Sequence, residues 1–303
     1  MQIYLPIAEI PVDIFTLLAL GIITGILSGM FGVGGGFLMT PLLIFIGISP
    51  AVAVSSSANQ IMAASFSGFL AHWRRNNVDF EIGILLLIGG IIGSSIGVWL
   101  FAILKNIGQI DLLISLTYVV FLGGVGYFMI IESTRSIFAK DKISKKKSVE
   151  ENIFYKIPYF KRHFVRSDIH ISALLPLITG FIAGMLVSIM GIGGGFIMIP
   201  AMIYILGMPT SIVIGTSLFQ IIFTTANVTL LQALSTQTVD IVLSFILLVG
   251  SVIGAQIGTK IGLKLKAEHL RVMLAIMVLI VAFKLGLGLI IEPELLYTVD
   301  RVE

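Results

Sequence analysis

Residues 29–41 read GMFGVGGGFLMTP, and a closely similar stretch, SIMGIGGGFIMIP, occupies residues 188–200. Each copy places three consecutive glycines between two apolar runs, with a proline five residues further on. The glycines are Gly34, Gly35 and Gly36 in the first copy and Gly193, Gly194 and Gly195 in the second. Because each glycine costs roughly 1 kcal/mol relative to alanine inside a helix, each triplet predicts a break between two helical segments.

The composition is that of a membrane protein. Of the 303 residues, 57% are hydrophobic and only 12% are charged, whereas a typical soluble domain has about 25% charged residues. The chain has no cysteine, which excludes disulfides and cysteine-ligated metals, and its four histidines show no spacing typical of metal ligands. We therefore expect no metal and no cofactor.

Ten apolar segments form two sets of five, separated by a polar stretch. The first set comprises residues 14–31, 37–48, 51–72, 80–104 and 110–131, and the second comprises residues 171–190, 196–206, 210–234, 239–263 and 270–291. The chain is therefore divided into a first transmembrane repeat (1–131), a basic linker (132–170) and a second transmembrane repeat (171–303).

The two sets have the same residue types at matching positions, which indicates an internal repeat. Gly35 and Gly194 are 159 residues apart, Gln60 and Gln220 are 160 apart, and Asp79 and Asp240 are 161 apart. Five crossings are an odd number, so the second copy is expected to be inserted upside down. The predicted fold is an all-α polytopic membrane protein of two inverted repeats, each of five membrane segments with a glycine-interrupted short or re-entrant helix.

Basic residues in the loops predict the orientation in the membrane. They cluster in residues 72–77, in the linker 132–170 and in residues 264–271, which we assign to the cytoplasm. Both termini then lie outside a multi-pass protein of the cell membrane. The linker mixes aromatic and basic residues, so we expect it to contact the anionic inner leaflet rather than nucleic acid.

The segments 37–48 and 196–206 are too short to cross a membrane of about 30 Å alone. Each would begin at its glycines near the middle of the membrane and direct free N–H groups and the positive end of its dipole into the protein. Glycines also allow a ligand to approach the backbone closely. Two such helix starts facing each other predict a central site for a small anion without any basic side chain.

Neutral polar side chains lie near these breaks in the sequence. The candidate substrate-binding residues are the six glycines together with Ser56, Ser57, Asn59, Gln60, Thr216, Ser217 and Gln220. The alternative for any single hydroxyl is a role in helix packing. Lys284, a charge inside an apolar segment, is a further candidate for attracting the anion, and snorkelling to the membrane surface is its alternative.

Other residues have a sequence pattern that is better explained by a structural role than by substrate binding. Asp79 and Asp240 each follow a polar loop and precede an apolar segment, which predicts helix N-caps. Four Gly-xxx-Gly pairs predict close helix contacts. These pairs are Gly25 with Gly29, Gly93 with Gly97, Gly180 with Gly184, and Gly254 with Gly258.

The paired GxGGGFxxxP pattern, the stretches AVAVSSSANQI (51–61) and IVIGTSLFQI (212–221), and the VD before residues 80 and 241 resemble the sulfite exporter TauE/SafE family of membrane permeases. The resemblance extends over about residues 15–290. It implies a bacterial or archaeal transporter of sulfur-containing oxyanions, either sulfite or organosulfonates. The first repeat differs from the more usual GTSL-like stretch, with Ser55, Ser56, Ser57 and Ala58 at that place.

Three functions remain open at this point. A secondary transporter that works by alternating access is favoured, and an anion channel would use the same central site. An intramembrane enzyme would need a nucleophile with a base or a metal-binding pair, and the apolar segments contain no such pairing, so we expect no enzymatic activity. A homo-oligomer is possible.

Overall fold

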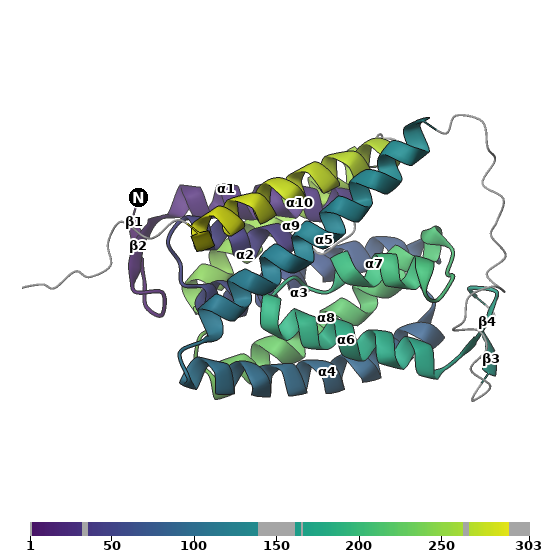
Figure 1. Cartoon of the computed structure of the whole chain (residues 1–303), viewed down its shortest axis with the longest axis horizontal. Helices are drawn as coiled ribbons and strands as arrows, with labels where there is room; N and C mark the ends of the chain where they lie inside the picture. Colours follow the sequence, from purple (N-terminus) through teal and green to yellow (C-terminus); the bar gives the residue numbers. More distant parts are fainter. Residues whose placement is uncertain (1, 32–35, 139–160, 165, 263–266, 291–303) are drawn as a thin grey trace, which may run out of the picture.

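The computed structural model describes residues 2–31, 36–138, 161–164, 166–262 and 267–290. The chain is mostly helical, as predicted (Figure 1). The helices are α1 (Ile14–Phe31), α2 (Gly36–Phe45), α3 (Pro50–Arg74), α4 (Phe80–Asn106), α5 (Ile110–Phe138), α6 (Leu174–Met190), α7 (Gly195–Tyr204), α8 (Thr210–Ser235), α9 (Ile241–Gly262) and α10 (Ala267–Ile290). Most of the linker and the tail 291–303 lie outside the described residues. The prediction that the linker contacts lipid falls on this part of the chain.

Four of the described helices are long and apolar enough to cross a membrane: they lie in residues 80–106, 110–127, 212–235 and 241–261. The outward surface is apolar as well. Ile84, Ile88 and Ile92 of α4, for example, are each more than two-fifths exposed. Such surfaces are costly in water but favourable in lipid. The helices α2 and α7 have 10 residues each, which gives about 15 Å and is too short for a crossing.

Glycines bring two pairs of helices, α1 with α9 and α4 with α6, into close contact. A Cβ atom added to Gly93 of α4 would lie 2.0 Å from the carbonyl oxygen of Phe181 in α6. One added to Gly258 of α9 would lie 2.0 Å from the carbonyl oxygen of Ile26 in α1. All eight glycines of the predicted pairs meet the backbone or a side chain of the facing helix in this way, so the predicted close contacts are confirmed.

The packing exchanges one helix between the two halves of the sequence. The helix α4 packs on α6 and α8, which follow the linker, and α9 packs on α1 and α3, which precede it. We call α1, α2, α3 and α9 the first bundle, and α6, α7, α8 and α4 the second bundle. The helices α3 and α8 lie against each other where the bundles meet, and α5 pairs with α10 (Figure 1).

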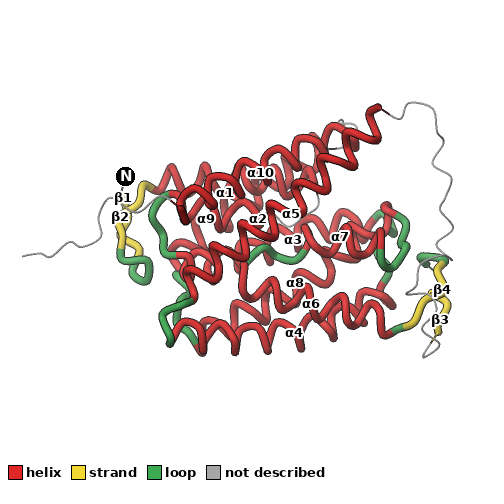
Figure 2. Tube along the Cα trace, in the orientation of Figure 1, coloured by secondary structure: helices red, strands yellow, loops and turns green. Residues whose placement is uncertain are grey.

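Two β-hairpins, which the sequence analysis did not predict, lie at opposite ends of the molecule (Figure 2). Strands β1 (Gln2–Leu5) and β2 (Ile10–Asp13) are antiparallel and lead directly into α1. Strands β3 (Lys161–Phe164) and β4 (Ile169–Ser172) are also antiparallel and precede α6. Each strand has only four residues, too few to show an alternating pattern in the sequence.

Candidate functional site

The second glycine triplet breaks the chain between α6 and α7, as predicted. Helix α6 ends at Met190, and Gly191, Gly193 and Gly194 all have positive φ, at 65°, 78° and 76°. Only glycine adopts this conformation without strain. Gly194 is the N-cap of α7 and supplies no side chain to satisfy the first N–H groups of that helix.

The first triplet lies at the corresponding place, between the end of α1 at Phe31 and the start of α2 at Gly36. Of its glycines, Gly36 is the first residue of α2 and is buried, whereas Gly34 and Gly35 lie outside the described residues. A Cβ atom added to Gly36 would lie 2.7 Å from the carbonyl oxygen of Gly191, at the second break. The start of α2 is therefore adjacent to the chain that joins α6 to α7.

Aromatic packing joins the starts of the two short helices. Phe37 of α2 and Phe196 of α7 stack with ring centroids 5.2 Å apart and ring planes inclined by 15°. Both side chains are almost fully buried. Because each phenylalanine directly follows the first residue of its helix, the N-terminal ends of α2 and α7 lie side by side in the interior of the protein.

Hydroxyl groups surround the break between α6 and α7. Ser57 of α3 is hydrogen-bonded to Thr40 of α2 at 2.8 Å, and its Oγ lies 3.5 Å from the carbonyl oxygen of Gly191. The hydroxyl of Tyr118 in α5 donates to the carbonyl oxygen of Met190. Sequence reasoning missed Tyr118, although a tyrosine within an apolar segment indicates that its hydroxyl has a buried partner.

Replacing Tyr118 with phenylalanine should therefore destabilise the protein. The change removes the donor but keeps the ring, so the carbonyl of Met190 stays buried without this partner, at a cost of about 1 kcal/mol. Thermal unfolding in detergent would measure the loss. Tyr4→Phe is a suitable control because Tyr4 is 60% exposed, and an equal change in both variants would contradict the prediction.

An isoleucine covers the glycines of both breaks. The side chain of Ile61 in α3 is fully buried. Its Cδ1 would lie 2.1 Å from a Cβ atom added to Gly36, and its Cγ2 would lie 2.5 Å from one added to Gly193. Ile61 therefore contacts backbone at both breaks. This role was not predictable, because in the sequence Ile61 is like every other apolar residue of its segment.

Among the candidate residues, two buried glutamines have amide atoms without a partner in the described part of the chain. Gln60 has neither its Nε2 nor its Oε1 hydrogen-bonded, and Gln220 lacks a partner for Oε1. The Nε2 of Gln220 donates to Thr224 at 2.8 Å, and this amide faces Gly90 of α4. Since buried amides are nearly always paired, these atoms indicate places where a ligand or water would bind. Asn59, the neighbouring candidate, is half-buried.

Three other candidate residues contact protein groups. The Ser56 hydroxyl accepts a hydrogen bond from the backbone N–H of Asp240 at 3.0 Å, and the Thr216 hydroxyl accepts one from the N–H of Asp79 at 2.9 Å. The Ser217 hydroxyl donates to the carbonyl oxygen of Ile214 in its own helix. Ser56 thereby connects α3 to the start of α9, and Thr216 connects α8 to the start of α4, within the two bundles.

The aspartates at these junctions are helix N-caps, as predicted. Asp79 Oδ1 accepts hydrogen bonds from the N–H groups of Glu81 and Ile82, and Asp240 Oδ1 accepts one from Leu243. The second oxygen of each carboxylate binds a hairpin. Ser167 donates to Asp79 Oδ2 at 2.5 Å.

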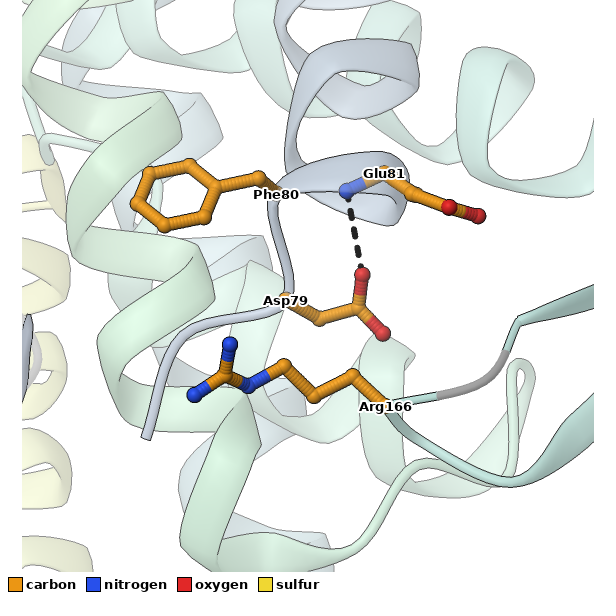
Figure 3. A pocket seen from close by; sticks show the side chains of 4 residues that line it. All are labelled: Asp79, Phe80, Glu81 and Arg166. Carbon is orange, nitrogen blue, oxygen red and sulfur yellow. Dashed lines mark hydrogen bonds between the residues drawn. The ribbon is translucent and has the colours of Figure 1, made fainter. Parts of the chain in front are cut away.

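Figure 3 shows the pocket beside this first cap, lined by Asp79, Phe80, Glu81 and Arg166. The guanidinium of Arg166 donates to the carbonyl oxygen of Asn76 at 2.7 Å, which holds the β3–β4 turn on the loop between α3 and α4. At the other cap, the N–H groups of Ile7 and Ala8 donate to Asp240 Oδ2 at 2.9 and 3.4 Å. Each hairpin is thus anchored on a helix from the other half of the sequence.

Replacing Asp240 with alanine is expected to lower the free energy of unfolding by about 2 kcal/mol. The change removes a helix cap, which alone is worth about 1 kcal/mol, and leaves the two hairpin N–H groups without their acceptor. Asp240→Asn retains one side-chain oxygen and should lose about half as much. Denaturation in detergent measures both, and equal stability of the alanine variant and the wild type would contradict the assignment.

Lys284 lies away from the glycine breaks. Its side chain is exposed, and its ammonium group lies 4.0 Å from the centre of the Phe45 ring. Phe45 is the last residue of α2, at the opposite end of that helix from Gly36. A cation at this position interacts favourably with the negative end of the helix dipole and with the face of the Phe45 ring.

Comparison with known proteins gives the family. The profile described as sulfite exporter TauE/SafE matches residues 17–285. The chain is 26% identical over 270 residues to a probable membrane transporter protein, YjnA, of Bacillus subtilis, covering 89% of this chain and 98% of the relative. It is 29% identical over 196 residues to the probable membrane transporter protein MJ0441 of Methanocaldococcus jannaschii, covering 61% and 59% of the two chains.

A shorter match is to a relative whose own name includes that of the family. Over 46 residues, covering 15% of this chain and 10% of the relative, the sequence is 39% identical to sulfite exporter TauE/SafE family protein 1 of Arabidopsis thaliana. No solved structure matches the chain significantly. The family profile covers most of the chain, including both glycine triplets and the helices that carry the candidate residues, and the chain therefore belongs to the sulfite exporter TauE/SafE family of membrane transporters.

Proposed function

We propose that the protein is a secondary transporter that moves small sulfur-containing oxyanions, sulfite or organosulfonates, across the cell membrane. The observation that carries this proposal is the meeting of two short helices, α2 and α7, at their buried N-terminal ends. The stacked pair Phe37 and Phe196 and the proximity of Gly36 to Gly191 define this meeting point.

The chemistry of the meeting point favours an anion. The first N–H groups of a helix have no partner within the helix, and its dipole places a partial positive charge there. Glycine backbones leave these groups accessible to a small oxyanion. Ser57 and Gln60 are neutral donors on the adjacent helix α3, and neutral groups allow the release that transport requires. Gly34 and Gly35 are included in the proposed site by analogy with Gly193 and Gly194.

Several structural features support the inverted repeat. Residues 159 or 161 positions apart have the same structural role in the two halves. One pair forms a ring stack, two pairs are non-glycine residues with positive φ, and one pair caps helices. These pairs are Phe37 with Phe196, Glu9 with Asp168, Asn76 with Gln237, and Asp79 with Asp240. The two hairpins at opposite ends of the molecule are a further matched feature (Figure 2).

We propose that alternating access arises from movement of the first bundle against the second rather than of residues 1–131 against 171–303. The glycine-mediated contacts hold α1 to α9 and α4 to α6, so each exchanged helix moves with its new partners. The chain passes between the bundles in the loops after α3 and α8. Asn76 and Gln237 lie in these loops with φ of 60° and 51°, and they are the proposed hinges.

Flux into proteoliposomes tests the function. Sulfite, sulfoacetate, a taurine-like sulfonate and sulfate are offered at several pH values, with empty liposomes as the control. We expect uptake of at least one sulfur oxyanion, and acceleration of labelled uptake by unlabelled anion inside, because counterflow is a property of a transporter and not of a channel. Movement of cations or neutral solutes without any oxyanion would refute the proposal, and oxyanion flux without counterflow would indicate a channel.

A further inference from the structure

We propose that the hydroxyls of Ser55, Thr238 and Thr236 hold the hinge between α8 and α9 closed and thereby keep the two bundles together at this end of the molecule. The inference rests on the proposed function, because the proposed hinge residue Gln237 lies between the two threonines. Oγ1 of Thr238 lies 2.8 Å from Oγ1 of Thr236 and 2.6 Å from Oγ of Ser55 in α3. We call these three side chains the hydroxyl chain.

The hydroxyl chain connects the two bundles. Thr236 is the C-cap of α8, in the second bundle, and its Oγ1 lies 2.8 Å from the carbonyl oxygen of Gln232. Ser55 belongs to α3, in the first bundle. Lys105, in the last turn of α4, donates to the carbonyl oxygen of Thr236 at 2.6 Å, and a cation there also interacts favourably with the negative end of the α8 dipole. A bend at Gln237 that separates α8 from α3 must therefore break the hydroxyl chain.

Burial makes these hydrogen bonds specific to the closed hinge. Ser55 is fully buried, and Thr238 and Thr236 are only 3% and 7% exposed. Ser55 can donate to Thr238, Thr238 to Thr236, and Thr236 to the carbonyl of Gln232, so three protons complete three bonds that strengthen one another. If this end opened, water would replace each bond. The loss of one hydroxyl therefore weakens the closed state more than the open state.

The hinge between α3 and α4 is held by different contacts. Gly215 lies 160 residues after Ser55, at the corresponding place in α8, and it has no hydroxyl. A Cβ atom added to Gly215 would lie 2.1 Å from the carbonyl oxygen of Asn77, which is 161 residues before Thr238. The helix α8 thus meets that loop through its backbone. Since the loop charges predict that the α8–α9 loop lies outside the cell, the hydroxyl chain closes the transporter toward the outside.

Distances between two spin labels test the proposal, since the chain has no cysteine of its own. The labels are attached to Tyr4→Cys, in the hairpin anchored on α9, and to Ile107→Cys, directly after α4, where both side chains are exposed. In lipid nanodiscs, Thr238→Val should raise the population with a longer label distance at least about fivefold, the effect of one lost hydrogen bond. Thr238→Ser retains the hydroxyl and should restore the original distances.

Thr24→Val is the matched control. The hydroxyl of Thr24 is also fully buried, but it donates to the carbonyl oxygen of Leu20 within α1, so its loss should leave the label distances unchanged. Ser55→Ala breaks the hydroxyl chain at its other end and should shift the distances in the same direction as Thr238→Val, with no loss of helix propensity. Unchanged distances in Thr238→Val and Ser55→Ala, or an equal shift in Thr24→Val, would overturn the proposal.

The label distances separate this proposal from the proposed function. If wild-type liposomes take up no oxyanion, the proposed function fails, and the distances still decide whether the hydroxyl chain holds the bundles together. If oxyanions are transported but the distances do not respond to the loss of the hydroxyl of Thr238 or Ser55, the function stands and these hydroxyls only stabilise the loop.

Discussion

Replacing Gly194 with valine is expected to reduce oxyanion flux at least about 100-fold, to the level of empty liposomes. Gly194 is the N-cap of α7 and has φ of 76°, a conformation that costs a β-branched residue of order 1–3 kcal/mol. A Cβ atom there would also lie 3.0 Å from a methyl group of Val187. The larger side chain would therefore displace the start of α7, where the proposed site lies.

The matched control is Gly108→Val. Gly108 has nearly the same φ, 78°, but it lies in the loop after α4, and apart from its chain neighbours no described residue has an atom within 4 Å of an added Cβ. This variant has the same conformational strain without a change at the site, so its flux should stay within about threefold of the wild type. If both variants are correctly inserted and transport equally well, the backbone at Gly194 is not part of the site.

Replacing Gly93 with alanine is expected to lower the free energy of unfolding by about 3 kcal/mol, the upper part of the range for overpacked positions. The added methyl would lie 2.0 Å from the carbonyl oxygen of Phe181. A backbone atom cannot move aside as a flexible side chain can, so α4 and α6 must separate. Thermal unfolding in detergent would measure the loss, accompanied by a lower yield of folded protein.

Gly124→Ala is the control for this second prediction. Gly124 lies within α5, and outside its own stretch of helix no described residue has an atom within 4 Å of an added Cβ. Alanine there should be neutral or more stable by up to about 1 kcal/mol, because alanine favours the helix. A Gly93→Ala protein as stable as Gly124→Ala would show that the close packing of α4 on α6 contributes little to stability.

Features that depend on local chemistry were predictable from the sequence. The Gly193–Gly195 triplet breaks the helix because glycine disfavours helix interiors, and Asp79 and Asp240 cap helices because a carboxylate accepts free N–H groups. The Gly-xxx-Gly pairs form close contacts for an equally local reason, the absence of a side chain. In each case the residue type itself limits the local structure.

Features that depend on which helices become neighbours were not predictable. The placement of α4 beside α6 and of α9 beside α1 is a property of the assembled molecule, since similar apolar segments can pair in many ways. The contact of Ile61 with both glycine breaks likewise depends on the fold, which brings Gly36 and Gly193 to the same side chain. Lys284 illustrates the same limit: its charge within an apolar segment was evident, but its position over Phe45 depends on how α10 packs.

The most direct measurement is the position of bound selenite, whose selenium replaces the sulfur of sulfite and scatters X-rays anomalously. The protein is crystallised with selenite, and the anomalous signal is recorded at the selenium edge. We expect a peak between the starts of α2 and α7, with selenite oxygens about 3 Å from backbone nitrogens of the glycine breaks. If selenite competes with the transported anion in the flux assay but its peak lies only elsewhere on the protein, the proposed site is wrong.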